Sequence, residues 1–222
     1  LAGPEAAIPE DAKLKADMEA DPCGRVAEVR QELEWLLSVE DEACKLTDLF
    51  NAGKLPLRVT HNDTKINNVL FDEQSHQALV VIDLDTVMPG LVGHDFGDAI
   101  RFASNFVEED CKDVDKAGVN LNIYWAFAEG FLKETAATLT ENEVNTLGIS
   151  CFSLACELAT RFLDDYITGD KYFKIKYPDH NLVRTRCQIA LAKDMQAKMD
   201  AMNAIVRDCW VRYRLSDPED NR

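Results

Sequence analysis

Four polar side chains at fixed spacing, in the stretch THNDTKINNVLFD, have the residue types that phosphoryl transfer requires. His61, Asp63, Lys65 and Asn68 follow the pattern H-x-D-x-K-x-x-N. Phosphoryl transfer needs a carboxylate that orients a hydroxyl and accepts its proton, an oxygen ligand for Mg²⁺ and a cation near the transferred group. Asp63, Asn68 and Lys65 offer these three functions, whereas we expect His61 to brace the loop. The alternative for any one of them is an ordinary turn residue that bonds the backbone.

A second source of metal ligands follows in the stretch VVIDLDT. A lone Asn holds Mg²⁺ poorly, because this hard cation prefers charged oxygen ligands. Asp83 and Asp85 come at the end of an apolar strand, and strand alternation would point both carboxylates to one face with Leu84 opposite. Such a pair favours a bound divalent cation. Asp83 is therefore a predicted metal ligand, and Asp85 is either a second one or an acceptor for a substrate hydroxyl.

These residues need a β element to position them, and the sequence predicts one inside a mainly helical chain. Residues 57–61, 68–72 and 79–85 are rich in strand formers, and the turn EQSHQ separates the last two runs. Apolar residues at helical spacing cover most of the remainder, which predicts an α+β, mostly helical fold. The predicted helices span residues 10–22, 24–38, 39–53, 95–106, 119–138, 150–168 and 181–214, after a linker at residues 1–9.

Composition argues against several partners and suggests a compartment. The 222 residues carry a formal net charge of −16, which repels nucleic acids and anionic membranes. No apolar run approaches the roughly 20 residues of a membrane span, and the first residues lack the pattern of a signal peptide. The seven cysteines are odd in number and form no C-x-x-C pair, which fits reduced thiols. We therefore expect a cytoplasmic protein with neither nucleic-acid nor membrane partners.

Six motifs together carry a family resemblance: THNDTKINNVLFD, VIDLDTVMPG, DFGDAIR, RFLDDY, GDKYFK and HNLVRTR. They resemble the N-acetylhexosamine 1-kinases, within the aminoglycoside phosphotransferase and choline kinase branch of the protein-kinase-like phosphotransferases. The resemblance implies ATP as co-substrate, Mg²⁺ as cofactor and the anomeric hydroxyl of an N-acetylhexosamine as acceptor. It also implies that Asp98 supports the backbone of the catalytic loop and that Arg161 and Tyr172 contact the substrate.

Alternative roles remain open for several of these residues. Arg161 could form a surface pair with Glu157 or Asp165, which lie four residues away on either side. Tyr172 could be a core aromatic with an exposed hydroxyl. The literal DFG at residues 95–97 is not the expected metal triplet, because Asp83 ends a strand 20 residues after Asp63 whereas Asp95 opens a helix. We expect Asp95 to be a helix N-cap.

The sequence also lacks parts of a complete kinase of this type. The ten glycines form no G-x-G-x-x-G, and no V-A-I-K-like strand precedes residue 58. We therefore expect a C-terminal lobe with a linker and short helix (1–22), helices (23–53), catalytic and metal loops (57–86) and a helical substrate-binding part (95–222). The N-terminal nucleotide lobe would be absent, the isolated chain inactive, and an apolar face exposed where that lobe would pack.

Two other functions stay open at this stage. One is phosphorylation of choline, another amino alcohol or an aminoglycoside, because the acidic stretches LDDY and EED could receive a cationic acceptor. The other is a non-catalytic interaction module that keeps a kinase-like lobe. Loss of a base or metal residue would indicate such a module, and Asp63, Asn68 and Asp83 are all present.

Overall fold

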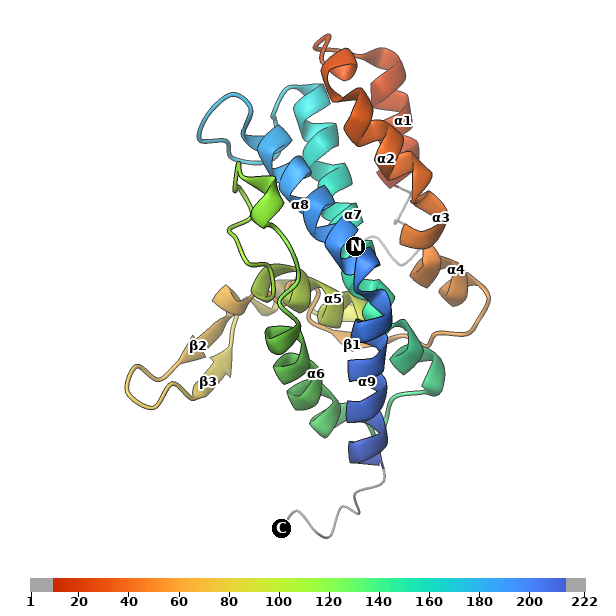
Figure 1. The fold of residues 1–222 in the computed structure, drawn as a ribbon, viewed down its shortest axis with the longest axis vertical. Coiled ribbons are helices and arrows are strands. Elements are labelled where there is room, and N and C mark those ends of the chain that lie inside the picture. Colours follow the sequence, from red (N-terminus) through yellow and green to blue (C-terminus); the bar gives the residue numbers. More distant parts are fainter. Residues whose placement is uncertain (1–9, 215–222) are drawn as a thin grey trace.

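The computed structural model describes residues 10–214, which form a mostly helical body with a small β element (Figure 1). The α+β, mostly helical fold predicted from the sequence is confirmed. The predicted linker at residues 1–9 lies outside the described residues.

The N-terminal helices run along one side of the body (Figure 1). They are α1 (Glu10–Ala20), the 3₁₀ turn η2 (Val26–Val29), α2 (Arg30–Ser38), α3 (Glu40–Ala43) and α4 (Lys45–Asn51). The single helix predicted for residues 39–53 is divided between α3 and α4. Gly53 has a φ of 68°, so the residue predicted to stop this helix adopts the left-handed conformation typical of that position.

The central helix is α7 (Glu141–Thr168), because α1, α3, α4, α5, α8 and α9 all pack against it. The elements around it are α5 (Val92–Ala103), η5 (Val114–Lys116), α6 (Leu121–Thr135), α8 (His180–Ala197) and α9 (Met199–Arg214). A capping box starts α7: the Thr140 hydroxyl accepts from the Glu143 backbone N–H, and the Glu143 carboxylate accepts from the Thr140 N–H. Gly169, at φ 101°, ends the helix.

In the described part of the chain, α7 is long and apolar enough to cross a membrane by length and composition. The sequence pattern predicted no such run. However, 67% of that apolar stretch is buried inside the protein, where it supplies core residues such as Leu147, Phe152 and Leu163. Core helices of globular proteins meet the same criterion, so the finding identifies α7 as a core element.

The predicted single helix at residues 181–214 is wrong in one respect, since the chain breaks between α8 and α9. Lys198 separates the two helices and leaves helical geometry at ψ 7°. Its ammonium donates to the Val119 carbonyl at 3.1 Å and to Asp194 at 2.7 Å. The break thus occurs where this side chain ties the two helices to the segment before α6.

The β element consists of two separate antiparallel pairs. The predicted hairpin is confirmed, with β2 (Val69–Phe71) paired to β3 (Ala78–Val81). The strand predicted at residues 57–61 is β1 (Arg58–Thr60), and it pairs with β4 (Met88–Gly90), which the sequence did not predict. Only glycine fits at residue 90, because a Cβ there would lie 2.3 Å from the Thr60 hydroxyl oxygen.

The β2–β3 hairpin projects from the helical body (Figure 1). Its apolar side chains are largely exposed, including Leu79 at 65%, Val80 at 49% and Val81 at 49%. Val59 on β1 and Leu84 after β3 are also exposed. Exposed apolar side chains thus gather in and beside the β element.

Candidate active site

The loop at residues 60–68 is held by two carboxylates on α5. Asp95 accepts from the backbone N–H groups of His61 and Asn62, each at 2.8 Å. Asp98 accepts from the Thr64 N–H at 3.0 Å, and the Thr64 hydroxyl donates to the Asp95 carbonyl at 2.7 Å. The loop that carries Asp63 is therefore fixed through its main chain.

The prediction that Asp95 is a helix N-cap is wrong. Leu91 is the N-cap, because α5 begins at Val92, and Asp95 lies in the first turn. Its carboxylate reaches across to the loop instead of capping its own helix. Sequence reasoning missed this role, although one signal was present: Asp95 and Asp98 are three residues apart and thus share a helix face.

Close packing of α5 on α7 places these carboxylates. A Cβ at Gly97 would lie 2.6 Å from the Ser150 carbonyl oxygen of α7, so only glycine allows this approach. Arg101 then donates to Asp98 at 2.9 Å and to Glu109 at 2.9 Å. The loop, α5 and the segment after α5 are thus joined by one chain of hydrogen bonds.

Strand β1 is anchored at the other end of the loop. Arg58 forms a two-pronged pair with Glu143, through Nε at 2.8 Å and a terminal nitrogen at 2.7 Å. The Glu143 side chain is only 1% exposed. Burial would raise the pKa of Glu143, but hydrogen bonds from Arg58 and Thr140 outweigh burial and lower it. Glu143 is therefore an ionised anchor between β1 and α7.

Asp63 has one carboxylate oxygen engaged and one open. Its Oδ2 accepts from Lys65 Nζ at 2.7 Å and from Asn68 Nδ2 at 3.0 Å. Among the residues that the structure describes, its Oδ1 has no hydrogen-bond partner. Partial burial would raise the pKa of Asp63, but the hydrogen bonds from Lys65 and Asn68 lower it below its ordinary value. Asp63 is thus ionised at neutral pH and has a free oxygen that can accept a proton.

The segment after β3 is tied to the same loop. His61 Nε2 lies 3.1 Å from the Ile82 carbonyl, which makes Nε2 the protonated nitrogen. Asn62 donates to the Thr86 carbonyl at 3.1 Å, and the Thr86 hydroxyl donates to the His61 carbonyl at 2.6 Å. The structure therefore places His61 as a brace between the loop and the segment that carries Asp83.

The predicted alternation of Asp83 and Asp85 along a strand is wrong. β3 ends at Val81, and Asp83 is left-handed, with φ 62° and ψ 54°. The 3₁₀ turn η4 (Leu84–Thr86) follows directly, so strand periodicity does not apply to Asp85. Asn62 in the loop has the same left-handed conformation, at φ 61°. Asn and Asp tolerate this region better than most residues, and such strained positions cluster at functional sites.

Asp83 and Asp85 have exposed carboxylates with no hydrogen bond or ion pair to any residue within 10–214. Asp83 nevertheless lies close enough to act on Lys65. The pKa of Lys65 is raised first by its hydrogen bond to Asp63, and the negative charges of Asp83 and Asp98 raise it further. Asp63, Lys65, Asn68 and Asp83 thus belong to one electrostatic cluster.

The oxygen donors of this cluster are of the chemical type that Mg²⁺ prefers. No group of three His, Cys, Asp or Glu side chains within the described residues could hold a metal by itself. Asn68 donates through Nδ2 to Asp63, which leaves its Oδ1 as the amide atom able to bind a cation. Asp83 adds a charged oxygen donor. One amide and one carboxylate oxygen, completed by phosphate oxygens and water, match the hard ligands that Mg²⁺ takes at such sites.

A cavity of about 690 Å³ lies next to the catalytic loop. Ile66 of the loop and Arg101 of α5 line it on one side. The segment after α5 and Gln188 of α8 line the rest. A small-molecule site of this volume is within the usual range for ligand pockets.

Arg161 and Tyr172 lie together in a different cavity, of about 340 Å³. The Arg161 guanidinium lies 5.8 Å from the centre of the Tyr172 ring and 3.8 Å from Glu157. Asp165 accepts instead from the backbone N–H groups of residues 171–173. Tyr172 is 74% exposed, so it is not a core aromatic. The lining of this cavity includes none of residues 61–68 or 83–85.

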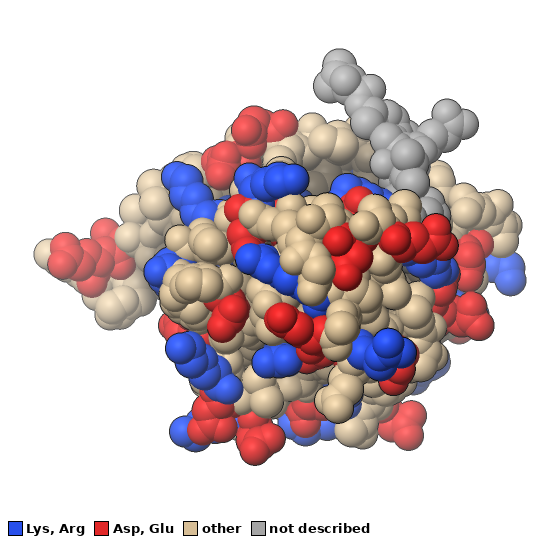
Figure 2. All heavy atoms as spheres, turned by 90° about the horizontal axis from the view of Figure 1, so that it is seen from above, with Lys and Arg blue, Asp and Glu red and all other residues tan. Residues whose placement is uncertain are grey.

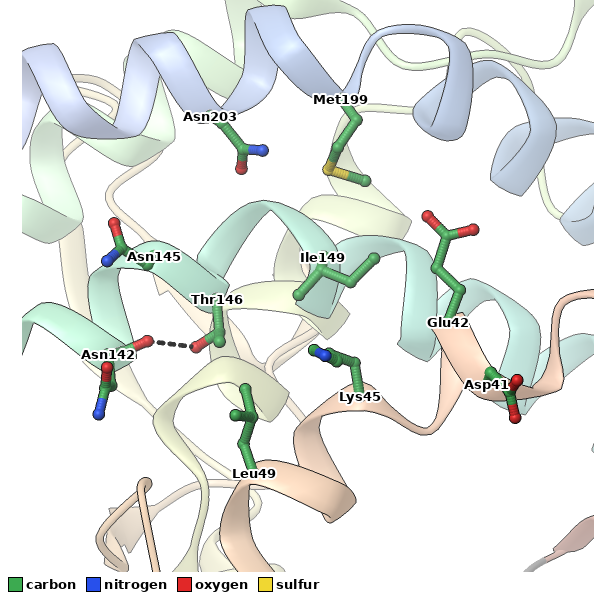
Figure 3. Close-up of a pocket in the computed structure, with 10 residues that line it drawn as sticks. All are labelled: Asp41, Glu42, Lys45, Leu49, Asn142, Asn145, Thr146, Ile149, Met199 and Asn203. Atoms are coloured by element: carbon green, nitrogen blue, oxygen red, sulfur yellow. Dashed lines mark hydrogen bonds between the residues drawn. The ribbon is translucent and has the colours of Figure 1, made fainter. Parts of the chain in front are cut away.

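A third hollow, of about 580 Å³, lies between α3–α4, the start of α7 and α9 (Figure 3). Asn142, Asn145 and Asn203 lie on one side of it, and Met199 of α9 faces Ile149 of α7 across it. It shares no lining residue with the loop at residues 60–68. The hollow therefore shares no residue with the cluster of Asp63, Lys65, Asn68 and Asp83.

Charge is distributed without a single dominant sign on the surface seen from above. Figure 2 shows Lys and Arg side chains interspersed with Asp and Glu across this face. The net charge of −16 therefore does not form one acidic area on this face.

Comparison with known protein families agrees with this site. The family model of the phosphotransferase enzyme family, APH, matches residues 2–131, which is more than half of the chain. The chain belongs to this family. The APH match includes the catalytic loop, Asp83, Asp85 and α5, whereas Arg161, Tyr172 and Gln188 lie beyond it. Membership of the APH family places the protein among small-molecule phosphotransferases in general.

Proposed function

We propose that this protein transfers the γ-phosphoryl group of ATP to a hydroxyl of a small molecule, with Asp63 as the catalytic base. The observation that carries the proposal is the state of the Asp63 carboxylate. Lys65 and Asn68 hold Oδ2, and Oδ1 has no partner among the described residues. The base is thus oriented, ionised and open on one side, which are the properties that the reaction requires.

The reaction follows from these positions. The acceptor hydroxyl donates its hydrogen bond to Asp63 Oδ1 and attacks the γ-phosphorus, and its proton passes to the carboxylate. A bond forms between the acceptor oxygen and phosphorus, and the bond from phosphorus to the β,γ-bridging oxygen breaks, so ADP leaves. Lys65 is close to both Asp63 and Asp83, and its ammonium can also meet the oxygens of the transferred group.

Asn68 and Asp83 are the proposed magnesium ligands, with Asp85 either beside them or on the acceptor. A magnesium ion held by these residues would neutralise charge on the phosphate oxygens and orient the chain of phosphates. The two protein ligands come from segments that hydrogen bonds join, because the Ile82 N–H donates to the Asn68 carbonyl at 2.9 Å. Support for these roles comes from donor chemistry and from this connection.

The proposed acceptor is an N-acetylhexosamine, phosphorylated at its anomeric hydroxyl. This assignment depends on the resemblance of the six motifs to N-acetylhexosamine 1-kinases, which also suggests Arg161 and Tyr172 as acceptor contacts. Choline, another amino alcohol or an aminoglycoside is the second candidate. It has one observation in its favour, since Glu108 and Glu109 of the EED stretch line the cavity next to the catalytic loop.

We also propose that ATP is held in part by a nucleotide lobe outside these 222 residues. The exposed apolar side chains of the β2–β3 hairpin support a covering partner there. The 222-residue chain alone should then bind ATP at least tenfold more weakly than the full gene product, which calorimetry would measure. Equal affinity would contradict a separate lobe.

The test of the main proposal is ATP turnover by the full-length protein with a panel of acceptors. N-acetylglucosamine, N-acetylgalactosamine, choline, ethanolamine and an aminoglycoside would be compared by release of ADP. Asp63→Asn should lower kcat by about 10²- to 10⁴-fold, whereas Asp200→Asn, an exposed aspartate on α9, should leave it unchanged. Normal turnover by the Asp63 variant would show that Asp63 is not the base.

A further inference from the structure

The cavity next to the catalytic loop has walls that are held in place from several sides. Arg101 pairs with Glu109 at 2.9 Å. On the same segment, Asp110 lies 3.0 Å from His180 Nε2 and 2.8 Å from Lys176 Nζ. Cys187 Sγ donates to the Glu108 carbonyl at 3.5 Å. Residues 105–111 are therefore fixed to both α5 and α8, and the cavity between them is a built feature of the fold.

Gln188, in the wall of this cavity, has an amide with no partner. The residue is 0% exposed, and neither Nε2 nor Oε1 forms a hydrogen bond within the part of the chain that the structure describes. A buried amide without partners is unfavourable, because it loses its hydrogen bonds to water on folding and gains none in return. Such a group in a pocket wall suggests a ligand that supplies the missing donor and acceptor.

We propose that this cavity is the acceptor pocket and that Gln188 recognises an amide group of the acceptor, such as the acetamido group of an N-acetylhexosamine. The proposal depends on the phosphotransferase function proposed above and specifies its acceptor. An acetamido group has one N–H donor and one carbonyl acceptor, the complement of the Gln188 side chain. Contact requires the Gln188 side chain to turn toward the cavity, since its amide atoms do not reach solvent.

The lining favours an uncharged acceptor over a cation. Arg101 already neutralises Glu109, and Glu108 is exposed at the rim. A desolvated cation needs an unpaired buried carboxylate, and none of the residues that line this cavity provides one. An aromatic ring can receive a quaternary ammonium, but the ring of Phe106 already has Lys198 Nζ 5.8 Å from its centre. Ile66, Phe102 and Val107 instead offer apolar surface for the carbon face of a sugar ring.

Cys111 provides a readout that does not require turnover. This free cysteine lines the cavity, whereas the exposed Cys23 does not. N-ethylmaleimide labelling of each cysteine in the full-length protein would be followed by peptide mass spectrometry, without ATP. N-acetylglucosamine at ten times its dissociation constant should slow labelling of Cys111 about tenfold by mass action. The rate at Cys23 should not change.

Two comparisons then isolate Gln188. Glucose, which lacks the acetamido group, should protect Cys111 with a dissociation constant at least tenfold higher than that of N-acetylglucosamine, about the effect of one or two net hydrogen bonds. Gln188→Leu should remove this preference, and Gln196→Leu on the same helix should preserve it. Because leucine removes an unpaired buried amide, Gln188→Leu should melt at the same temperature as the parent or higher. A purely structural glutamine would instead lower the melting temperature and leave the sugar preference intact.

Three results would overturn the proposal. Equal protection by glucose and N-acetylglucosamine would show that the pocket does not recognise the acetamido group. A preference for N-acetylglucosamine that survives Gln188→Leu would show that Gln188 does not make the contact. Protection by choline with none by either sugar would assign the pocket to a cationic acceptor. The same labelling in the Asp63→Asn variant separates this proposal from the catalytic one, because protection there should persist while turnover is lost.

Discussion

The two halves of the candidate site differ in how their carboxylates are partnered. On the loop at residues 60–68, Asp63 is held by Lys65 and Asn68, and the main chain around it is held by Asp95 and Asp98. On the segment at residues 82–86, the backbone is equally well tied, yet Asp83 and Asp85 have no partner among the described residues. The contrast lies in the side chains and not in the backbone.

This difference indicates which charges serve the fold and which serve a ligand. A partnered carboxylate contributes to stability, and its removal leaves donors unsatisfied. An unpartnered carboxylate on a fixed backbone contributes little to stability but presents a fixed negative charge. We therefore expect mutations in the first half to affect folding and catalysis together, and mutations in the second half to affect binding of the cation or the acceptor with little effect on stability.

Removal of Asp95 should have the largest effect. Asp95→Ala leaves the N–H groups of His61 and Asn62 without their acceptor, which should lower the free energy of unfolding by about 2–4 kcal/mol. The loop backbone would also shift, so kcat should fall roughly 100-fold, as expected for a base displaced by about 1 Å. Urea denaturation and ATP turnover would measure both, with Asp200→Ala as the control. Turnover within threefold of the parent would show that α5 does not position the base.

Glu143 should have the next largest effect, and this effect depends on pH. The pKa of Glu143 is lower in the folded state than in the unfolded chain, so the folded protein binds this proton less tightly. Its contribution to stability is therefore complete at neutral pH and is lost as the pH falls through the lowered pKa. Glu143→Gln should reduce the free energy of unfolding by about 1–3 kcal/mol at pH 7 and flatten its dependence on acidic pH. Glu141→Gln, on the same turn, should reproduce the parent curve.

Asp83 and Asp85 test the unpartnered half. Asp83→Asn should raise the magnesium concentration for half-maximal turnover on the order of tenfold, because a charged ligand is lost. Its free energy of unfolding should stay within about 0.5 kcal/mol of the parent. Asp85→Asn decides the role of the second carboxylate, since a higher magnesium requirement would make it a metal ligand and a higher acceptor KM would make it a hydroxyl acceptor. A large loss of stability in either variant would show that these carboxylates serve the fold, as those of the first half do.

Arg161 should have the smallest effect. Its pair with Glu157, at 3.8 Å, is partly exposed, and such pairs contribute roughly 0.2–1 kcal/mol. If the acceptor occupies the cavity next to Ile66, Arg161→Lys should change the acceptor KM by less than about twofold. The resemblance to hexosamine kinases makes the opposite prediction. A tenfold rise in the acceptor KM of Arg161→Lys would show that the acceptor binds in the cavity of Arg161 and Tyr172.

The parts of this site that the sequence could predict are those determined by local spacing. Asp63, Lys65 and Asn68 lie on one short loop, so their proximity follows from chain connectivity. The β2–β3 hairpin has a strong turn between two strand-forming runs, and it is present as predicted. By contrast, β4 contains Pro89 and Gly90, which are poor strand formers, and it exists because β1 lies beside it.

Residues whose roles depend on packing between distant elements were missed. The function of Asp95 depends on α5 docking against the loop, which in turn requires Gly97 on Ser150. The left-handed Asp83 depends on the contacts that hold Ile82 and Thr86. Gln188 lies on the buried face of α8, as its apolar neighbours do. Only the lack of a hydrogen-bond partner for its side-chain amide within the described residues distinguishes it. Periodicity cannot report any of these, because it contains no information on which faces meet.

The backbone of one residue, Ile82, connects the two halves of the candidate site. Its N–H is bonded to the residue that would hold the cation, Asn68, and its carbonyl to the brace of the base loop, His61. Any shift of this short stretch on cation arrival is therefore felt on both sides at once. A coupling between cation and acceptor that passes through Ile82 must be reciprocal, so each ligand would change the affinity for the other by the same factor.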